Sequence, residues 1–530
     1  MAADRNEPGV SMTNALVRFA LLPNLYKDSV TLMQIAARLR EREGIEQASC
    51  LMGTPANLAQ LGDAGLTVDT KASPSDLLIV VRGAAEACDA ALEAAQKMLQ
   101  ASGSHEDGSS AAFSPPLTSL AAGVQQAPEA DIALISVPGD YAAAEAMKAL
   151  SLGLHVMLFS DNVPIGEEKK LKQRARSKGL LVMGPDCGTA IVNGVPLGFA
   201  NVVRRGDIGL VAASGTGLQE VTCRIHNLGA GVSQALGTGG RDLKEEIGGI
   251  TMLQGLQALA DDARTRVIVL ISKPPAPAIA REILRIAAGA GKPVVVHFLG
   301  AAPDEIRQAG LHAALSLRHT ADVAVALAQG VAPPLSTPVA QERDVAAIAQ
   351  LARGMTSTQR AVRALYAGGT FCYEAQLVFL ARGLPCRSNA PAHGASDFGG
   401  RFEGHLFLDL GDDDYTRGRP HPMIDPSVRN EMIRAQGADL GAAAILFDVV
   451  LGYGSHEDPA RDLALALRDA VAQARAQGRA LALIGHVCGT DSDPQNKAQQ
   501  VAQLQAMGAV IATSNVEAAL LAAHLAELRR

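Results

Sequence analysis

Short apolar segments alternate with longer amphipathic segments along most of the chain. The apolar segments run for about four to eight residues and are rich in Val, Ile and Leu, which is typical of strands. The segments between them repeat apolar residues with helical spacing. Strands that are apolar on both faces are expected where helices cover both sides of a parallel sheet. The pattern therefore predicts an α/β chain of tandem doubly wound parallel-sheet domains, Rossmann-like or flavodoxin-like.

The first predicted domain is small and covers residues 14–101. A stretch rich in Ser, Gly and Pro follows it at 102–116, and this composition is typical of a linker. The strands and helices expected before that linker alternate in the order Leu16–Leu22, Asp28–Arg40, Ala48–Gly53, Pro55–Leu61, Asp76–Val81 and Ala84–Leu99.

The alternation resumes after the linker and predicts three further domains, at residues 128–203, 206–330 and 346–530. A second Pro-rich stretch at 331–343 separates the last two of them. In open parallel sheets, ligands bind outside the carboxyl ends of the strands, where loops lead into helix N-termini. Functional residues are therefore expected in the loops that follow the predicted strands.

Composition and charge exclude several classes of protein. Lys and Arg number 47 against 54 Asp and Glu, which gives a net charge of −7, whereas a nucleic-acid binder needs a basic face. Trp is absent and aromatic residues make up only 3%, so platforms that stack on bases are not expected. No apolar run approaches the roughly 20 residues that span a bilayer, and no secretory signal is recognised. We expect a cytosolic chain without nucleic-acid or membrane partners.

Cysteine spacing argues against a metal or disulfide framework. The seven cysteines are widely spaced and form no C-x-x-C pair. A disulfide-stapled fold or a zinc site usually shows paired cysteines at short, regular spacing. No metal ligands are therefore assigned from the sequence.

Two glycine-rich loops follow neighbouring predicted strands and are candidates for anion binding. The first opens a helix, whose backbone N–H groups and dipole attract an anion. The second adds a guanidinium group that can make bidentate contacts to phosphate or carboxylate. Each loop taken alone is also consistent with an ordinary turn between a strand and a helix. The candidate residues are Ser214, Gly215, Thr216, Gly239, Gly240 and Arg241.

The densest polar cluster lies at residues 411–426, directly after an apolar strand. Arg417 and Arg419 favour a carboxylate or phosphate ligand, and Asp412 is a further binding candidate. His421 can act in general acid or base catalysis. Carboxylates of this kind also bind Mg²⁺, but no spacing here is specific for that ion. The alternative is a surface loop whose charges pair with one another.

Further strand-end loops precede predicted helices nearer the C-terminus. Gly452 and Gly454 follow one apolar strand, and the segment Gly368–Thr370 follows another. Such loops either cap helices or contact ligands, and the sequence does not separate the two.

These loops, in this order, resemble succinyl-CoA synthetase with both subunits represented on one chain. Residues of about 131–325 are similar to its α subunit, and 346–530 to the carboxy-terminal domain of its β subunit. The resemblance implies a CoA-binding-like Rossmann domain at 128–203 and a ligase-like domain at 206–330. Over nearly its whole length the chain resembles the FdrA family, through Met52–Asn57, Phe159–Val163, Ser214–Gly217, Gly240–Leu243, Ser272–Pro275 and Asp412–Pro426.

The chain departs from the synthetase at three places. The synthetase carries a phosphorylated histidine between glycines, whereas the matching segment here, Ala309–Ala314, places His312 after a leucine. Glu220 does match the carboxylate that holds that imidazole. The ATP-grasp domain has no counterpart in this sequence. The loop Pro23–Asp28 lacks the glycines that seat the CoA nucleotide, so the sequence does not establish that CoA binds. No cofactor is assigned as required, and CoA and Mg²⁺ both stay open.

The FdrA resemblance implies one subunit of an oxamate carbamoyltransferase that acts with partner proteins in anaerobic allantoin breakdown. The reaction would convert oxalurate and phosphate to oxamate and carbamoyl phosphate, which is an acyl phosphate. Transfer of this kind depends on positioning two anions and stabilising charge. In this hypothesis Ser214, Thr216 and Gly239 hold phosphate, Arg419 binds the acceptor carboxylate and His421 assists proton transfer. The catalytic candidates are therefore His421, Glu220 and Arg419.

Two alternatives remain at this level. The chain could be a subunit of an ADP-forming acyl-CoA synthetase that borrows an ATP-grasp domain from another chain, which requires His312 to be phosphorylated. It could also be a non-catalytic scaffold that binds a metabolite and assembles the other subunits. All three hypotheses predict an oligomer and small anionic ligands.

Overall fold

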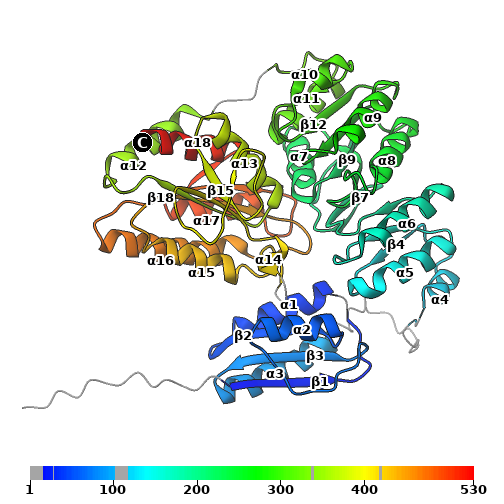
Figure 1. The fold of residues 1–530 in the computed structure, drawn as a ribbon, viewed down its shortest axis with the longest axis horizontal. Coiled ribbons are helices and arrows are strands. Elements are labelled where there is room, and N and C mark those ends of the chain that lie inside the picture. The colour runs from blue at the N-terminus through cyan, green and yellow to red at the C-terminus, as the bar shows by residue number, and fades with distance from the viewer. Residues whose placement is uncertain (1–15, 28, 102–116, 118, 336–339, 417–419) are drawn as a thin grey trace, which may run out of the picture. The chain divides into compact units, whose positions relative to one another are not determined.

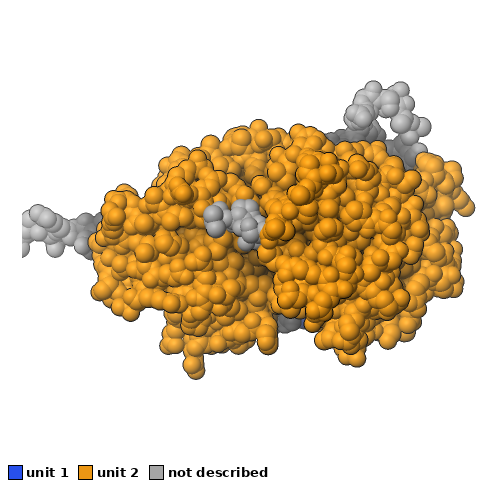
Figure 2. Space-filling model, turned by 90° about the horizontal axis from the view of Figure 1, so that it is seen from above, with its two compact units in different colours: residues 1–116, 417–420 blue, residues 117–416, 421–530 orange. Residues whose placement is uncertain are grey.

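The computed structural model describes residues 16–27, 29–101, 117, 119–335, 340–416 and 420–530. The chain divides into two compact units, residues 1–116 with 417–420, and residues 117–416 with 421–530. Seen from above, the larger unit presents one continuous surface (Figure 2). The predicted linker at 102–116 and the candidates Arg417 and Arg419 lie outside the described residues.

The smaller unit contains a three-stranded sheet in the order β1-β3-β2. The central strand β3 is antiparallel to both neighbours, so the expectation of a parallel sheet is wrong for this domain. Leu77–Val81 of β3 is fully buried, and an apolar strand of this kind suits the centre of either type of sheet. The elements are β1 (Leu16–Leu22), α1 (Ser29–Arg40), β2 (Ile45–Met52), α2 (Pro55–Asp63), β3 (Leu77–Gly83) and α3 (Ala85–Ala101).

The larger unit begins with a parallel three-stranded sheet in the order β4-β5-β6. Its helices bury small residues against the strands, such as Ala142 and Ala146 of α5. The elements are α4 (Leu120–Gln126), β4 (Ile132–Ile135), α5 (Gly139–Ser151), β5 (His155–Leu158), α6 (Ile165–Ser177) and β6 (Val182–Met183).

A seven-stranded sheet follows, in the order β13-β12-β11-β9-β10-β7-β8, and is parallel except for the β7–β8 hairpin and its pairing with β10. Alternate residues of its strands face two different cores, with Leu210 on the α7 and α11 side and Val211 on the α8 and α9 side (Figure 1). Its strands are β7 (Thr189–Val192), β8 (Val195–Gly198), β9 (Arg205–Ala213), β10 (Val232–Gly237), β11 (Val267–Ser272), β12 (Val294–Phe298) and β13 (His312–Ala313). Its helices are α7 (Gly215–Asn227), α8 (Ile250–Asp261), α9 (Pro277–Ala288), α10 (Pro303–Gln308) and α11 (Leu317–Ala328).

The last sheet has seven parallel strands in the order β16-β15-β17-β14-β18-β19-β20. Helices α13 and α18 cover one face, and α15 and α16 cover the other (Figure 1). Its strands are β14 (Ala361–Tyr366), β15 (Cys386–Ser388), β16 (Ser396–Asp397), β17 (His405–Asp409), β18 (Ala442–Val450), β19 (Ala482–Cys488) and β20 (Val510–Ala512). Its helices are α12 (Glu342–Arg353), α13 (Gly369–Ala381), α14 (Asp413–Thr416), α15 (Ser427–Gln436), α16 (Pro459–Ala476), α17 (Lys497–Ala506) and α18 (Asn515–Leu528).

One apolar core joins the two seven-stranded sheets. Leu218 of α7 and Val323 of α11 belong to the same buried cluster as Phe371 of α13 and Ala522 of α18. A layer of helices from each sheet therefore packs against a layer from the other. The prediction of doubly wound parallel-sheet domains is confirmed for the larger unit. Within the described ranges, no helix combines the length and the hydrophobicity that a membrane crossing requires.

Candidate functional site

The first turns of α7 and α13 meet in the contact between the two large sheets. Ser214 caps α7, because its Oγ accepts a hydrogen bond from the Gly217 N–H at 3.1 Å. The Oγ of Ser214 also lies 2.7 Å from Oγ1 of Thr370, in the first turn of α13. We call Ser214–Gly217 and Gly368–Phe371 the facing helix termini. From the sequence, Thr370 was named only as part of the loop Gly368–Thr370, which either caps a helix or contacts a ligand.

The glycines of the facing helix termini differ in how much space surrounds them. A Cβ atom on Gly368 would lie 3.0 Å from Oδ2 of Asp448 and 3.1 Å from Cγ2 of Thr216. A Cβ atom on Gly369 would collide with Oδ2 of Asp409. Gly215 is different, because its nearest such neighbour is 3.7 Å away. Close packing therefore requires the two glycines of α13 but not Gly215.

Two buried carboxylates stand beside the start of α13. Asp448 accepts hydrogen bonds from the Ala367 and Gly368 N–H groups, each at 2.7 Å, and fixes the turn into the helix. Burial raises the pKa of Asp409 to about 6, against the lowering effect of Lys273. The sequence pattern did not select Asp409 or Asp448, and Lys273 was named only within the family-resemblance segment Ser272–Pro275. These three ionisable residues set the charge around the helix start.

The glycine-rich loop after β10 is held by the three-stranded sheet of the same unit. Gly239 has a φ of +82°, and a Cβ there would collide with the Pro185 carbonyl oxygen. Gly240 has more room, with Oδ2 of Asp186 3.8 Å from an added Cβ. Arg241 donates to the Val163 carbonyl at 2.8 Å and pairs with Glu168 at 2.9 Å. Its guanidinium is therefore engaged by protein, although about a third of the side chain is exposed.

A buried ion cluster beside this loop was missed from the sequence. Lys172 of α6 pairs with Asp242 at 2.7 Å and with Glu168 at 2.9 Å, and all three side chains are fully buried. Asp242 also accepts the N–H groups of Thr251 and Met252 at the start of α8. The only sequence signal was the spacing of Glu168 and Lys172, four residues apart on one helix. The cluster ties α6 to the loop after β10.

Glu220 holds an imidazole, but the imidazole belongs to His486 of β19. The carboxylate and the His486 Nε2 are 2.7 Å apart and both side chains are buried. Burial acts to raise the pKa of Glu220, but the charge and hydrogen bond of His486 outweigh it, and the pKa is lowered. Glu374 of α13 lies near this pair and accepts the Leu317 N–H at 2.8 Å. Burial raises the pKa of Glu374 to about 7.

His312 lies away from the facing helix termini. It is in β13, the edge strand of its sheet, paired with Val295 of β12. Through β11 that register continues to Leu210 of β9, three residues before Ala213. A separation of three strands and three residues corresponds to roughly 17 Å from the end of β9. Burial lowers the pKa of His312.

His421 is held in a neutral form. Its Nδ1 accepts the Met423 N–H at 3.2 Å, so the ring proton resides on Nε2. Burial, together with the nearby charge of Arg429, lowers the pKa of His421 to about 4. At neutral pH this imidazole is therefore a weak base, although Nε2 can still donate a hydrogen bond. Asp412 accepts the Asp414 N–H at 3.1 Å in the turn that opens α14.

Backbone packing accounts for Gly452 and Gly454. Their φ angles are +115° and +77°, in the region that favours glycine. A Cβ on Gly452 would lie 2.6 Å from the Ala200 carbonyl oxygen, and one on Gly454 would lie 2.9 Å from the Phe199 ring. The loop therefore packs on residues 198–201, and its glycines are explained without a bound phosphate.

Three family models match the chain. They are described as AllF, heavy metal-associated domain, at residues 12–115, as CoA binding domain at 203–300, and as CoA-ligase at 365–525. The uncharacterized protein YahF of Escherichia coli (strain K12) is 42% identical over 515 residues, which cover 96% of this chain and 98% of YahF. The chain belongs to the YahF family. This is a succinyl-CoA synthetase-like family of the FdrA/AllF type.

More distant relatives match the middle of the chain. The succinate–CoA ligase [ADP-forming] subunit alpha 2 of Archaeoglobus fulgidus is 29% identical over 163 residues, 30% of this chain and 55% of that protein. The malate–CoA ligase subunit alpha of Methylorubrum extorquens is 28% identical over 217 residues, 39% of this chain and 72% of that protein. The YahF-family chain therefore carries succinyl-CoA synthetase-like domains. These comparisons favour the acid–CoA ligase hypothesis over carbamoyl transfer.

Proposed function

We propose that this chain is the acyl-phosphate-handling subunit of an acid–CoA ligase-type enzyme and that a partner subunit supplies the ATP-grasp domain. The observation that carries the proposal is the 2.7 Å contact between the hydroxyls of Ser214 and Thr370. Each helix start presents backbone N–H groups without intrahelical partners and about half a positive charge. Two such starts in contact favour a phosphoryl group more strongly than one does.

The same arrangement suits the half-reaction between an acyl phosphate and CoA. The thiol of CoA attacks the acyl carbon, the C–S bond forms and the C–O bond to phosphate breaks. The thiol proton passes to solvent and the phosphate departs as an oxyanion. Donors already oriented toward the phosphoryl oxygens stabilise that developing charge. Ser214, Thr216 and Thr370 supply hydroxyls, and the N–H of Gly215 is a further donor in this proposal.

Glu220 has a positioning role in this proposal. Its carboxylate is committed to His486 at 2.7 Å and stands in the second turn of α7. It therefore supports the helix whose first turn binds the anion. His421 contributes at most a hydrogen bond from Nε2, since its pKa of about 4 makes it a poor base at neutral pH.

A second candidate is a subunit of an oxamate carbamoyltransferase, which uses the same phosphoryl site with another acceptor. Phosphate oxygen would attack the carbamoyl carbon of oxalurate, the C–N bond would break and the nitrogen would take a proton. The position of His312, three strands from β9, favours this candidate, because carbamoyl phosphate needs no phosphohistidine carrier. The AllF description of the N-terminal family model agrees with the allantoin pathway implied by the FdrA resemblance.

One assay separates the two candidates. The chain is co-purified with its partner subunits and given either succinyl phosphate with CoA, or oxalurate with phosphate. Thioester formation supports the ligase, and carbamoyl phosphate formation supports the transferase. Neither product from the complete mixture would overturn both. We expect Thr370→Ala to lower whichever activity is found by about tenfold, and exposed Ser357→Ala, a hydroxyl outside the site, to leave it unchanged.

A further inference from the structure

A cavity of about 300 Å³ lies between α7 and the strands β19 and β20. Glu220 and Arg224 line it from one face of α7, because residues four apart on a helix point the same way. Nine residues separate Gly215 from Arg224, which is about 14 Å along the helix. The cavity is therefore distinct from the facing helix termini.

Three cationic side chains converge on this cavity from three helices. They are Arg224 of α7, Arg343 of α12 and Lys497 of α17. Lys497 makes no ion pair with any residue that the structure describes. The lining contains one carboxylate, that of Glu220, and it is already paired with His486. Arg224 and Arg343 each pair with a carboxylate outside the lining, Asp322 at 3.0 Å and Asp344 at 3.5 Å. Among the described residues that line the cavity, Lys497 is therefore the cation that has no such pair.

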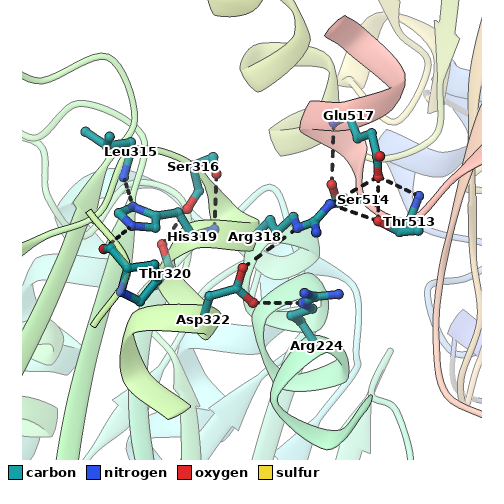
Figure 3. A network of polar contacts seen from close by, with 11 residues as sticks. Arg224, Leu315, Ser316, Arg318, His319, Thr320, Asp322, Thr513, Ser514 and Glu517 are labelled. Carbon is teal, nitrogen blue, oxygen red and sulfur yellow. Dashed lines mark hydrogen bonds and ion pairs between the residues drawn. The ribbon is translucent and has the colours of Figure 1, made fainter. Parts of the chain in front are cut away.

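The wall of the cavity is fixed by a polar network (Figure 3). Arg224 donates to Asp322 at 3.0 Å, and Asp322 faces Arg318 at 3.8 Å. Arg318 in turn donates to Thr513 at 2.9 Å and pairs with Glu517 at 3.1 Å. Arg224 and Thr513 both line the cavity, so this chain of contacts holds two of its edges in place. Binding would need little reordering of those side chains.

We propose that this cavity binds a small metabolite that carries two or more oxyanion groups, carboxylate or phosphate. Its volume stands at the lower end of the range for small-molecule sites. Three cations at separate positions suit a ligand with charge at both ends better than a single ion. Arg224 belongs to the segment matched by the CoA binding domain model, and Lys497 to that matched by the CoA-ligase model. A bound anion would therefore bridge the two sheets and stabilise their contact.

Isothermal titration calorimetry on the full chain tests the proposal, with succinate, citrate and 3-phosphoglycerate as probes at constant ionic strength. We expect at least one probe to bind saturably. Lys497→Ala should weaken that binding by about tenfold, while Lys497→Arg should retain it. Lys169→Ala, which removes an exposed lysine of α6, serves as the matched control and should leave the affinity within about twofold.

Two results would overturn the proposal. One is that none of the three probes binds the wild-type chain. The other is binding that Lys497→Ala leaves unchanged; if Ser214→Ala/Thr370→Ala then abolishes that binding, the probe occupies the facing helix termini. A tricarboxylate preference over 3-phosphoglycerate, or the reverse, identifies which oxyanion the cavity takes. The outcome is independent of acyl transfer, so it does not depend on the proposed activity.

Discussion

Helices α7 and α13 carry two kinds of polar group at two levels, with opposite chemistry. At their first turns Ser214 and Thr370 bring together neutral hydroxyls among small residues. Further along, Glu220 and Glu374 are buried acids, and Glu220 is paired with His486. We call the first turns, with Ser214 and Thr370, the upper level, and the turns that carry Glu220 and Glu374 the lower level. In the proposed function the backbone N–H groups of the upper level bind a ligand, whereas the carboxylates of the lower level are hydrogen-bonded within the protein. A single sequence run, Ser214–Glu220, therefore contains the turn that we propose binds a phosphoryl group and a buried carboxylate with a structural role.

The largest expected effect comes from breaking the lower level. Glu220→Ala leaves the buried imidazole of His486 without its carboxylate, and loss of one partner of a buried pair costs about 3–5 kcal/mol. Urea denaturation of the full chain measures this change in the free energy of unfolding. Glu282→Ala removes an exposed ion pair with Arg285 and should leave the free energy of unfolding almost unchanged, because solvent screens such pairs. Equal costs for the two variants would contradict the assignment.

The next effect is a pH dependence that Glu374 imposes on stability. Burial raises the pKa of Glu374 from 4.5 to about 7, so the folded chain binds more protons than the unfolded chain between these values. The wild type should then lose on the order of 2–3 kcal/mol as pH rises from about 4.5 to 7. Glu374→Gln lacks this loss, and its stability relative to wild type should increase across that range and level off above it. Denaturation at a series of pH values shows whether the difference is constant, which would refute the prediction.

A smaller effect is expected where the upper level is tightly packed. Gly368→Ala places a methyl group 2.8 Å from the Phe371 ring and 3.0 Å from Asp448, and overpacking of this kind costs about 1–3 kcal/mol. Gly215→Ala is the matched substitution, because its Cβ finds no neighbour nearer than 3.7 Å. Its stability should stay within about 0.5 kcal/mol of wild type. Thermal unfolding of the two variants compares them, and an equal loss would show that the two helix starts are packed alike.

The smallest effect concerns the cap of α7. Ser214→Ala removes the hydrogen bond to the Gly217 N–H and should cost about 1 kcal/mol. Ser514→Ala removes the equivalent cap of α18 and should cost a similar amount. Only the first should weaken phosphate binding, as measured by calorimetry. Loss of binding in both would mean that general destabilisation, not the site, is responsible.

Local pattern predicted most of the elements of this chain. The strand Leu16–Leu22 begins and ends where the pattern placed it, and the helix predicted to Arg40 ends there. Apolar runs and helical spacing are properties of neighbouring residues, so they can be recognised without knowledge of the fold. The direction of β3 is not such a property, because a fully apolar strand suits both parallel and antiparallel centres.

The sequence did not predict which residues of distant segments lie in contact. Glu220 and His486 are 266 residues apart, and Ser214 and Thr370 are 156 apart. Glycine-rich loops also look alike as sequence, although Gly452 is fixed by the Ala200 carbonyl while Gly215 is not enclosed. Arg241 has the composition of an anion ligand but pairs with Glu168. Only the neighbours of each residue in the folded chain distinguish a glycine or arginine that binds a ligand from one that packs against protein.

The central claim is that the facing helix termini bind a phosphoryl group, and a calorimetric titration of inorganic phosphate tests it most directly. The full wild-type chain should bind phosphate saturably. Ser214→Ala/Thr370→Ala should weaken that binding by at least about tenfold, while Ser514→Ala stays within about twofold. Unchanged affinity in the double variant, or no saturable binding by the wild type, would contradict the claim.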